Sequence, residues 1–137
     1  DISIAAINGP SSVVVSGTHE AMERLSATLA ESDIKAKPLS VSHAFHSAMM
    51  EPMLAEFEKV ASSISYTKPK IPVCSNVTGG IVTGEVTTSA YWVRHVREPV
   101  RFAAGVEALH AEGVDTFLEV GPKPALLGMA RQCLPDD

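Results

Sequence analysis

"ISIAAINGPSSVVV", residues 2–15, sets the fold class at the start of the chain. The apolar run over residues 2–7 ends in the turn-forming residues "NGPSS", and a triplet of valines follows at 13–15. β-Branched residues favour strands, whereas Asn, Gly, Pro and Ser favour turns. The stretch therefore predicts two short strands joined by a tight connection.

The spacing of apolar residues changes at residue 18. Leucine and methionine side chains then recur at three- and four-residue steps, at Met22, Leu25 and Leu29. This period predicts an amphipathic helix over residues 19–31, with Thr18 as its N-cap. Residues 34–41, "IKAKPLSV", return to an extended pattern, in which Pro38 favours an edge strand or an interruption. The first forty residues are thus expected to be β-β-α-β.

A second helix is predicted after residue 47, with Ser47 as its N-cap. Its expected apolar face consists of Met50, Met53, Leu54, Phe57, Val60 and Ala61. Pro52 predicts an irregular first turn. The two prolines before "VCSNV", residues 73–77, leave room for only a short strand.

The last third of the chain alternates between helix and strand patterns. "TTSAYWVRHVREP" predicts a helix that is capped by threonine and ends before Pro99. A further helix is expected over residues 102–111, with Gly113 as its stop. Residues 115–134 then predict a strand, a Gly-Pro turn and a helix, which is typical of α/β proteins. The main organisational break is expected near residues 39–46.

Composition narrows the class of protein. A chain of 137 residues with 45% hydrophobic and 20% charged residues fits one globular domain. A net charge of -5 without a run of Lys or Arg argues against a nucleic-acid partner. No apolar run approaches the roughly 18 residues of a membrane span, so no membrane partner is expected. Cys74 and Cys133 predict reduced thiols in a cytoplasmic protein, with Cys74 as a small buried hydrophobe.

The stretch "VSHAFHS", residues 41–47, carries the candidate chemistry. Its two histidines, three residues apart, could bind a metal ion, but no third ligand completes a zinc site. Composition alone favours a packing role for such histidines, and His19 and His110 fit that role on polar helix positions. General-base catalysis is the remaining alternative, yet no GxSxG motif supplies a nucleophile.

Five stretches, in order, resemble one family: "AAINGPSSVVVSG", "VSHAFHS", "PVCSNVTG", "YWVRHVREPVRF" and "FLEVGPKPAL". The chain is similar to the C-terminal half of an acyltransferase domain of the malonyl-CoA:acyl-carrier-protein transacylase family, in the form found in modular polyketide synthases. The resemblance implies that residues 1–40 are part of a ferredoxin-like small subdomain. Residues 41–137 are then the C-terminal part of a large α/β-hydrolase-like subdomain.

The resemblance also implies roles for individual residues. His46 matches the family's general base, and the match to its orienting backbone carbonyl is His95. Asn76 matches a position near the site, where bracing a turn is its expected task. The catalytic serine, the oxyanion hole and the carboxylate-binding arginine are expected upstream of this chain, and Arg94, Arg97 and Arg101 are not assigned that last role. The chain is therefore expected to be a fragment that is inactive by itself.

The implied reaction transfers a malonyl unit from malonyl-CoA to the phosphopantetheine thiol of an acyl carrier protein, with no metal or bound organic cofactor. The upstream half of the domain and neighbouring synthase domains are the other expected partners. In the family, HAFH accompanies malonyl selection and YASH methylmalonyl selection, so His43 and Phe45 are the expected specificity residues. The alternatives are a non-catalytic interaction fragment and the malonyl/acetyl transferase of a fatty acid synthase.

Overall fold

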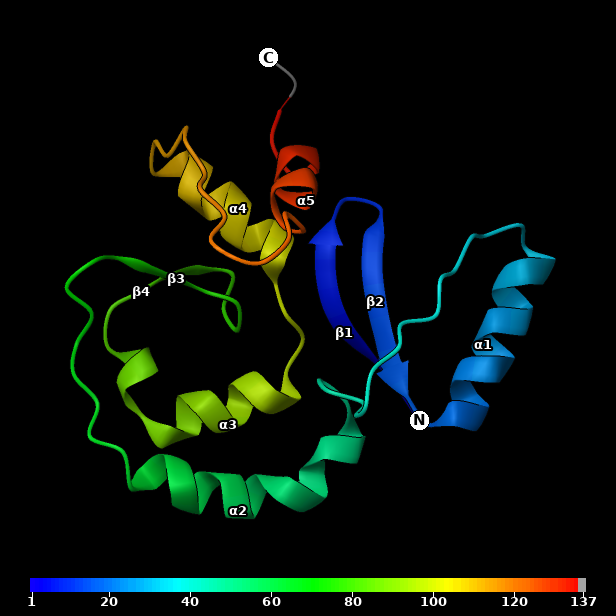
Figure 1. Ribbon diagram of the computed structural model, residues 1–137, viewed down its shortest axis with the longest axis horizontal. Coiled ribbons are helices and arrows are strands. Elements are labelled where there is room, and N and C mark those ends of the chain that lie inside the picture. Colours follow the sequence, from blue (N-terminus) through cyan, green and yellow to red (C-terminus); the bar gives the residue numbers. More distant parts are fainter. Residues whose placement is uncertain (136–137) are drawn as a thin grey trace.

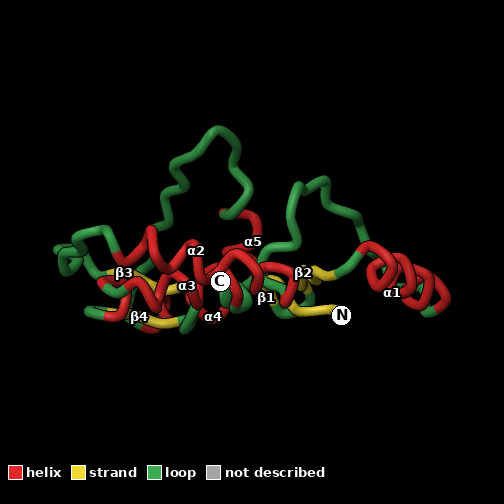
Figure 2. Tube along the Cα trace, turned by 90° about the horizontal axis from the view of Figure 1, so that it is seen from below, coloured by secondary structure: helices red, strands yellow, loops and turns green. Residues whose placement is uncertain are grey.

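The computed structural model describes residues 1–135 and is a mixed α/β structure (Figure 1). In chain order its elements are β1 (Ile2–Gly9), β2 (Ser12–Gly17), α1 (His19–Glu31), the 3-10 turn η1 (Ala48–Met50), α2 (Glu51–Ser62), β3 (Val73–Ser75), β4 (Gly80–Val82), the 3-10 turn η2 (Glu85–Thr87), α3 (Ser89–Arg97), α4 (Phe102–Ala111) and α5 (Leu127–Gln132). Figure 2 shows these elements side by side in one layer, from which the loop after α1 and the loop before α5 project.

The strands form two separate antiparallel pairs, β1 with β2 and β3 with β4. In the first pair Ile2 lies opposite Gly17 and Ile7 lies opposite Val13, which confirms the predicted hairpin. The N-cap predicted for α1 is also confirmed, because the Ala21 N–H donates to Thr18 Oγ1 at 3.3 Å. No helix within residues 1–135 has the length and apolar character needed to cross a bilayer.

Strand β1 is the link between the two ends of the sequence. The Val100 N–H donates to the Ala5 carbonyl, and the Ile7 N–H donates to the Val100 carbonyl, both at 2.8 Å. Helices α4 and α5 pack against the same strand (Figure 1). The apolar cluster that they form contains Ile7, Phe102, Ala103, Val106, Phe117, Ala130, Cys133 and Leu134. Val100 is therefore held in place by pairing with β1.

Helices α2 and α3 lie side by side (Figure 1). The irregular start predicted from Pro52 is confirmed, because Ser47 caps η1 and α2 follows with the proline in its first turn. Met50 and Ala61 are buried as predicted, but Val60 is 63% exposed, so its placement on the packed face was wrong. Only one side of α2 faces α3, so the buried face of the helix is narrower than the apolar face predicted from the sequence.

Two of the predicted strands are absent from residues 1–135. Residues 34–41 form no strand, and neither does the segment 115–121 before α5. Both predictions were wrong for the same reason, because a strand requires a hydrogen-bonded neighbour and no described strand lies beside either segment. Their apolar side chains stay exposed, as Val41 at 71% and Val120 at 90% illustrate.

The turn between β3 and β4 provides a test of the described fold, because it packs closely against α4. Gly79 has a φ of 72°, and a Cβ atom there would lie 2.7 Å from the Cβ of Ala104. Gly79→Ala should lower the free energy of unfolding by about 1–3 kcal/mol, through left-handed strain and overpacking. Gly80 is the matched control, since a Cβ there meets no atom within 4 Å. Gly80→Ala should change stability by less than about 1 kcal/mol in urea unfolding. Equal losses at both positions would contradict the described turn.

Candidate functional site

His46 lies in the turn just before η1 and has an unusual backbone conformation. Its φ is 62°, in the left-handed region that costs free energy for a residue with a Cβ. Two hydrogen bonds to the C-terminal end of α3 hold it there. The His46 N–H donates to the Val96 carbonyl at 3.1 Å, and Nδ1 lies 2.7 Å from the Glu98 carbonyl oxygen. Backbone and imidazole are thus fixed by the same helix.

The second of these bonds determines the tautomer of His46. A carbonyl oxygen can only accept, so Nδ1 must be the donor. The neutral imidazole therefore carries its proton on Nδ1 and its free lone pair on Nε2. Within residues 1–135, the bond to Glu98 is the one hydrogen bond made by the ring. Nε2 is left free to take a proton, as a general base requires.

Pro99 explains why the acceptor is Glu98. A residue before proline is driven out of the helical region, and Glu98 accordingly has φ -81° and ψ 154° at the C-cap of α3. This extended conformation ends the helix and turns the Glu98 carbonyl away from its axis. The prediction that His95 supplies the carbonyl was wrong, because His95 lies inside the helix and its carbonyl follows the helix direction. The pre-proline position was the sequence signal for the correct residue.

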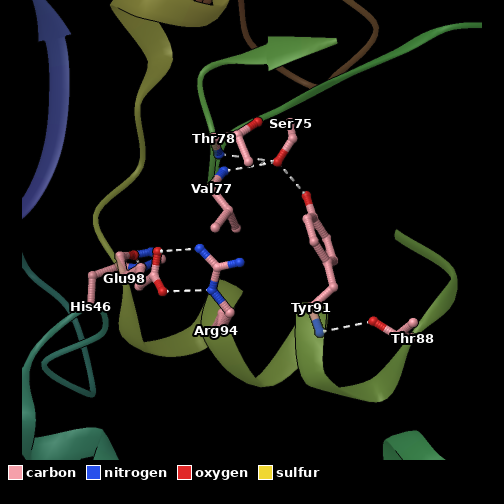
Figure 3. Close-up of polar contacts among 8 residues, drawn as sticks. All are labelled: His46, Ser75, Val77, Thr78, Thr88, Tyr91, Arg94 and Glu98. Atoms are coloured by element: carbon pink, nitrogen blue, oxygen red, sulfur yellow. Dashed lines mark hydrogen bonds and ion pairs between the residues drawn. The ribbon is translucent and has the colours of Figure 1, made fainter. Parts of the chain in front are cut away.

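Arg94 holds Glu98 in two ways (Figure 3). Its guanidinium donates to both carboxylate oxygens, at 2.7 Å and 3.1 Å. Its carbonyl accepts from the Glu98 N–H at 2.7 Å. The hydrogen bond from Arg94 lowers the pKa of the Glu98 carboxyl group. With the two side chains 54% and 35% exposed, solvent screening makes this pair a weak contributor to stability. Sequence reasoning gave Arg94 no role.

The other end of α3 is anchored by buried polar contacts (Figure 3). Ser75 Oγ accepts from the N–H groups of Val77 at 3.1 Å and Thr78 at 3.3 Å. Because both lone pairs are then used, its hydroxyl donates to Tyr91 Oη, 2.8 Å away. The Thr88 hydroxyl accepts from the Tyr91 N–H and caps the helix, as predicted. These bonds tie α3 to the turn between β3 and β4.

Asn76 does not brace this turn through its side chain in the way that was predicted. Ser75 is the last residue of β3 and is buried, whereas Asn76 lies in the turn that follows and is exposed. The bracing hydrogen bonds come from Ser75 instead. Asn76 contributes its backbone carbonyl, which accepts from the Arg101 N–H at 2.8 Å.

Three aromatic rings, those of His43, Phe45 and His95, form a row together with the ring of His46. The rings of His43 and Phe45 lie 6.1 Å apart, and Phe45 is 6.4 Å from His46. On the other side, the His95 ring packs edge-on at 6.4 Å from His46. Phe45 is 48% exposed, so half of its ring is open to a neighbouring group. The structure thus brings together the four histidine and phenylalanine residues that were predicted to have a role in the site. His19 and His110, which were given none, are exposed on other helices.

Comparison with known proteins identifies the family. The model of the acyl transferase domain family matches residues 1–136. The chain belongs to this family. The resemblance seen in the sequence is therefore confirmed, and the acyltransferase relatives include curated polyketide synthases. The chain is 50% identical over 135 residues to the spectinabilin polyketide synthase system protein NorB of Streptomyces orinoci, covering 98% of this chain and 6% of NorB. It is 47% identical over 133 residues to polyketide synthase GfsA of Streptomyces halstedii, covering 97% of this chain and 2% of GfsA.

Solved acyltransferase structures have the same fold. The acyltransferase domain from the second module of the salinomycin polyketide synthase superposes with a TM-score of 0.93 at 49% identity, over 98% of this chain and 32% of that one. The domain of SpnD, solved in complex with 2-(pent-4-yn-1-yl)malonyl, gives 0.93 at 34% identity, over 96% and 33%. The malonyl-CoA:acyl carrier protein transacylase FabD of Xanthomonas oryzae gives 0.89 at 28% identity, over 96% and 42%. The chain thus spans about a third of the solved synthase domains.

The cysteines of this acyltransferase chain are packing residues. The Cys74 thiol donates to the Gly105 carbonyl and the Cys133 thiol to the Asn8 carbonyl, both at 3.4 Å. Burial raises the pKa of both thiols, which keeps them protonated. Within residues 1–135, no three His, Cys, Asp or Glu side chains come together as metal ligands.

His95 gives the site a testable pH dependence. Burial lowers its pKa below the usual 6.5, and the neighbouring charge of His46 lowers it further. The unfolded chain then binds this proton more tightly than the folded chain does. The free energy of unfolding should therefore fall as the pH decreases through 6.5 and level off below the lowered pKa. His95→Gln should flatten this part of the curve in urea unfolding. Parallel curves for the two proteins would contradict the assignment.

Proposed function

We propose that this chain carries the general base of an acyltransferase domain that moves a malonyl unit from malonyl-CoA to the phosphopantetheine thiol of an acyl carrier protein. The observation that carries the proposal is the hydrogen bond from His46 Nδ1 to the Glu98 carbonyl, which leaves the lone pair of Nε2 free to accept a proton. Membership of the acyl transferase domain family supports the reaction class. The malonyl derivative bound by SpnD supports the substrate class.

The first half-reaction forms an acyl-enzyme. His46 Nε2 removes the hydroxyl proton of a serine as the serine oxygen attacks the thioester carbonyl of malonyl-CoA. We assign this serine to another part of the same domain, because these 137 residues contain no GxSxG motif. The tetrahedral intermediate collapses with cleavage of the carbon–sulfur bond, and His46 returns its proton to the departing CoA sulfur. Malonyl-serine and CoA are the products.

The second half-reaction releases the acyl group. The phosphopantetheine thiol gives its proton to His46 and attacks the serine ester, so a new carbon–sulfur bond forms. Cleavage of the ester carbon–oxygen bond then frees the serine, which recovers a proton from His46. The Glu98 carbonyl holds the Nδ1 proton throughout, in the position that many serine hydrolases give to an aspartate.

Several features favour a polyketide synthase over a fatty acid synthase as the parent protein. Over the aligned residues the chain is 47% identical to GfsA and 50% identical to NorB, whereas it is 28% identical to the FabD structure. The chain also covers only 2% and 6% of those synthases, which fits a multidomain parent with neighbouring domains as partners. Within such a domain, β1, β2 and α1 belong to a ferredoxin-like small subdomain, and residues 41–137 belong to the large subdomain.

The ring row around His46 supports a malonyl preference. Phe45 lies beside the catalytic imidazole with half of its ring exposed, where it would meet a 2-methyl group on the substrate. Rejection of methylmalonyl-CoA is then steric. A pocket discriminates one methyl group by only about 1–3 kcal/mol, so selection should be strong but incomplete.

The catalytic assignment is tested by histidine replacement in the complete domain. His46→Ala should lower the rate of serine acylation by about two to four orders of magnitude, because general-base assistance is lost. His19 and His110 are the matched controls, since both are exposed on helices. Their replacement by Ala should leave the rate within about twofold. Intact-mass measurement of the malonyl-enzyme after rapid mixing provides the rate. Similar losses at all three positions would point to a folding effect, and no loss at His46 would favour a non-catalytic role for the chain.

The specificity assignment is tested by the double change His43→Tyr and Phe45→Ser. These substitutions remove the phenyl ring and open space for a methyl group, so the ratio of methylmalonyl to malonyl transfer should rise at some loss of total rate. Competition between equimolar malonyl-CoA and methylmalonyl-CoA, read from the masses of the acyl-enzymes, measures the ratio. An active double variant with the original ratio would place selection elsewhere in the domain.

A further inference from the structure

We propose that Arg94 is a positioning residue for the catalytic histidine, acting through Glu98 and its carbonyl on the His46 imidazole. The inference rests on the proposed function of His46 as general base. It assigns to Arg94 a task inside the protein, distinct from any contact with the substrate carboxylate.

A continuous set of short contacts connects the guanidinium to the imidazole. Arg94 holds the Glu98 carboxylate with two hydrogen bonds, at 2.7 Å and 3.1 Å. The Glu98 carbonyl in turn accepts from His46 Nδ1 at 2.7 Å. In Figure 3 the guanidinium faces both carboxylate oxygens, and His46 lies next to Glu98. Paired hydrogen bonds to a planar guanidinium restrict orientation more than a single contact does.

The Glu98 peptide needs this restraint because it stands outside regular structure. It follows the last residue of α3 and precedes Pro99, so the helix does not fix its carbonyl. On its C-terminal side, Val100 is held by the hydrogen bonds to Ala5 and Ile7 of β1. On its N-terminal side, the bonds to Arg94 are the corresponding anchor. Removing the Arg94 side chain leaves the backbone bond from the Glu98 N–H to the Arg94 carbonyl as the remaining anchor on this side.

The expected effect is on rate rather than on binding or stability. Proton transfer depends steeply on geometry, and a misplacement of about 1 Å can cost as much as 100-fold. Both side chains of the ion pair are partly accessible to solvent, at 54% and 35%, so its loss should hardly change the melting temperature. The KM for malonyl-CoA should also stay near its original value, because Arg94 acts on His46 and not on the substrate.

A double-mutant cycle in the complete domain tests the proposal. Arg94→Ala and Glu98→Ala should each lower the acylation rate constant roughly tenfold. Glu98→Ala keeps the backbone carbonyl, so it removes the support without removing the acceptor. The double variant should also lose roughly tenfold, because both residues act through one contact. A loss near 100-fold in the double variant, or no loss in the single ones, overturns the proposal.

Helix α1 offers a matched control. Arg24 and Glu20 form an exposed pair of the same chemistry and spacing at 3.3 Å, far from His46 in sequence. Arg24→Ala should leave the acylation rate within about twofold. Arg94→Lys, which keeps the charge but loses the planar fork, should recover part of the rate lost in Arg94→Ala. The Nδ1 proton resonance of His46 should shift in Arg94→Ala and stay unchanged in Arg24→Ala. An unshifted resonance in both variants counts against the proposal.

The His46→Ala variant distinguishes failure of the positioning role of Arg94 from failure of the proposed function of His46. If it abolishes acylation while Arg94→Ala does not lower it, the positioning role fails and the proposed function stands. If His46→Ala itself retains the full rate, the proposed function fails. Melting temperatures of Arg94→Ala and Arg24→Ala that differ by several degrees would show that Arg94 acts on folding, which also overturns the positioning role.

Discussion

The hydrogen bond between His46 Nδ1 and the Glu98 carbonyl is the contact on which the candidate site depends. It joins residues 52 positions apart and fixes both the orientation and the tautomer of the imidazole. A second bond, from the His46 N–H to Val96, holds a backbone conformation that an isolated turn would avoid. The conformational strain at His46 is offset by contacts with a helix formed much later in the chain.

The position of α3 is therefore as important as the histidine itself. At its start, α3 is held by the buried bond between Ser75 and Tyr91. Removing one partner of such a bond typically costs about 1–3 kcal/mol, because the remaining polar groups lose their partners away from water. Beyond its end, Val100 pairs with β1. The site is thus fixed by elements from three separate parts of the sequence, and errors in their packing would move the imidazole.

A backbone carbonyl in the orienting position differs physically from a carboxylate. It carries no full charge, so it stabilises the imidazolium ion less than an aspartate would, but it also cannot titrate. The orientation of His46 is then independent of the protonation of its partner. The geometry also depends on Pro99, which sets the conformation of Glu98, and on Arg94, which holds its side chain. Because every residue has a backbone carbonyl, the site depends less on which side chain the acceptor residue carries than on the neighbouring residues that position its carbonyl.

Local sequence determined the hairpin, the helices with their threonine and serine caps, and the motif around His46, because capping, turn chemistry and helical period act between residues close in the chain. The strands expected at 34–41 and 115–121 did not form, since apolar spacing indicates a strand but cannot supply its partner. Tertiary structure decided that the carbonyl bonded to His46 Nδ1 belongs to Glu98 and not to His95, and that Ser75 and not Asn76 braces the neighbouring turn. These outcomes depend on which way a carbonyl or a side chain points once distant segments have packed.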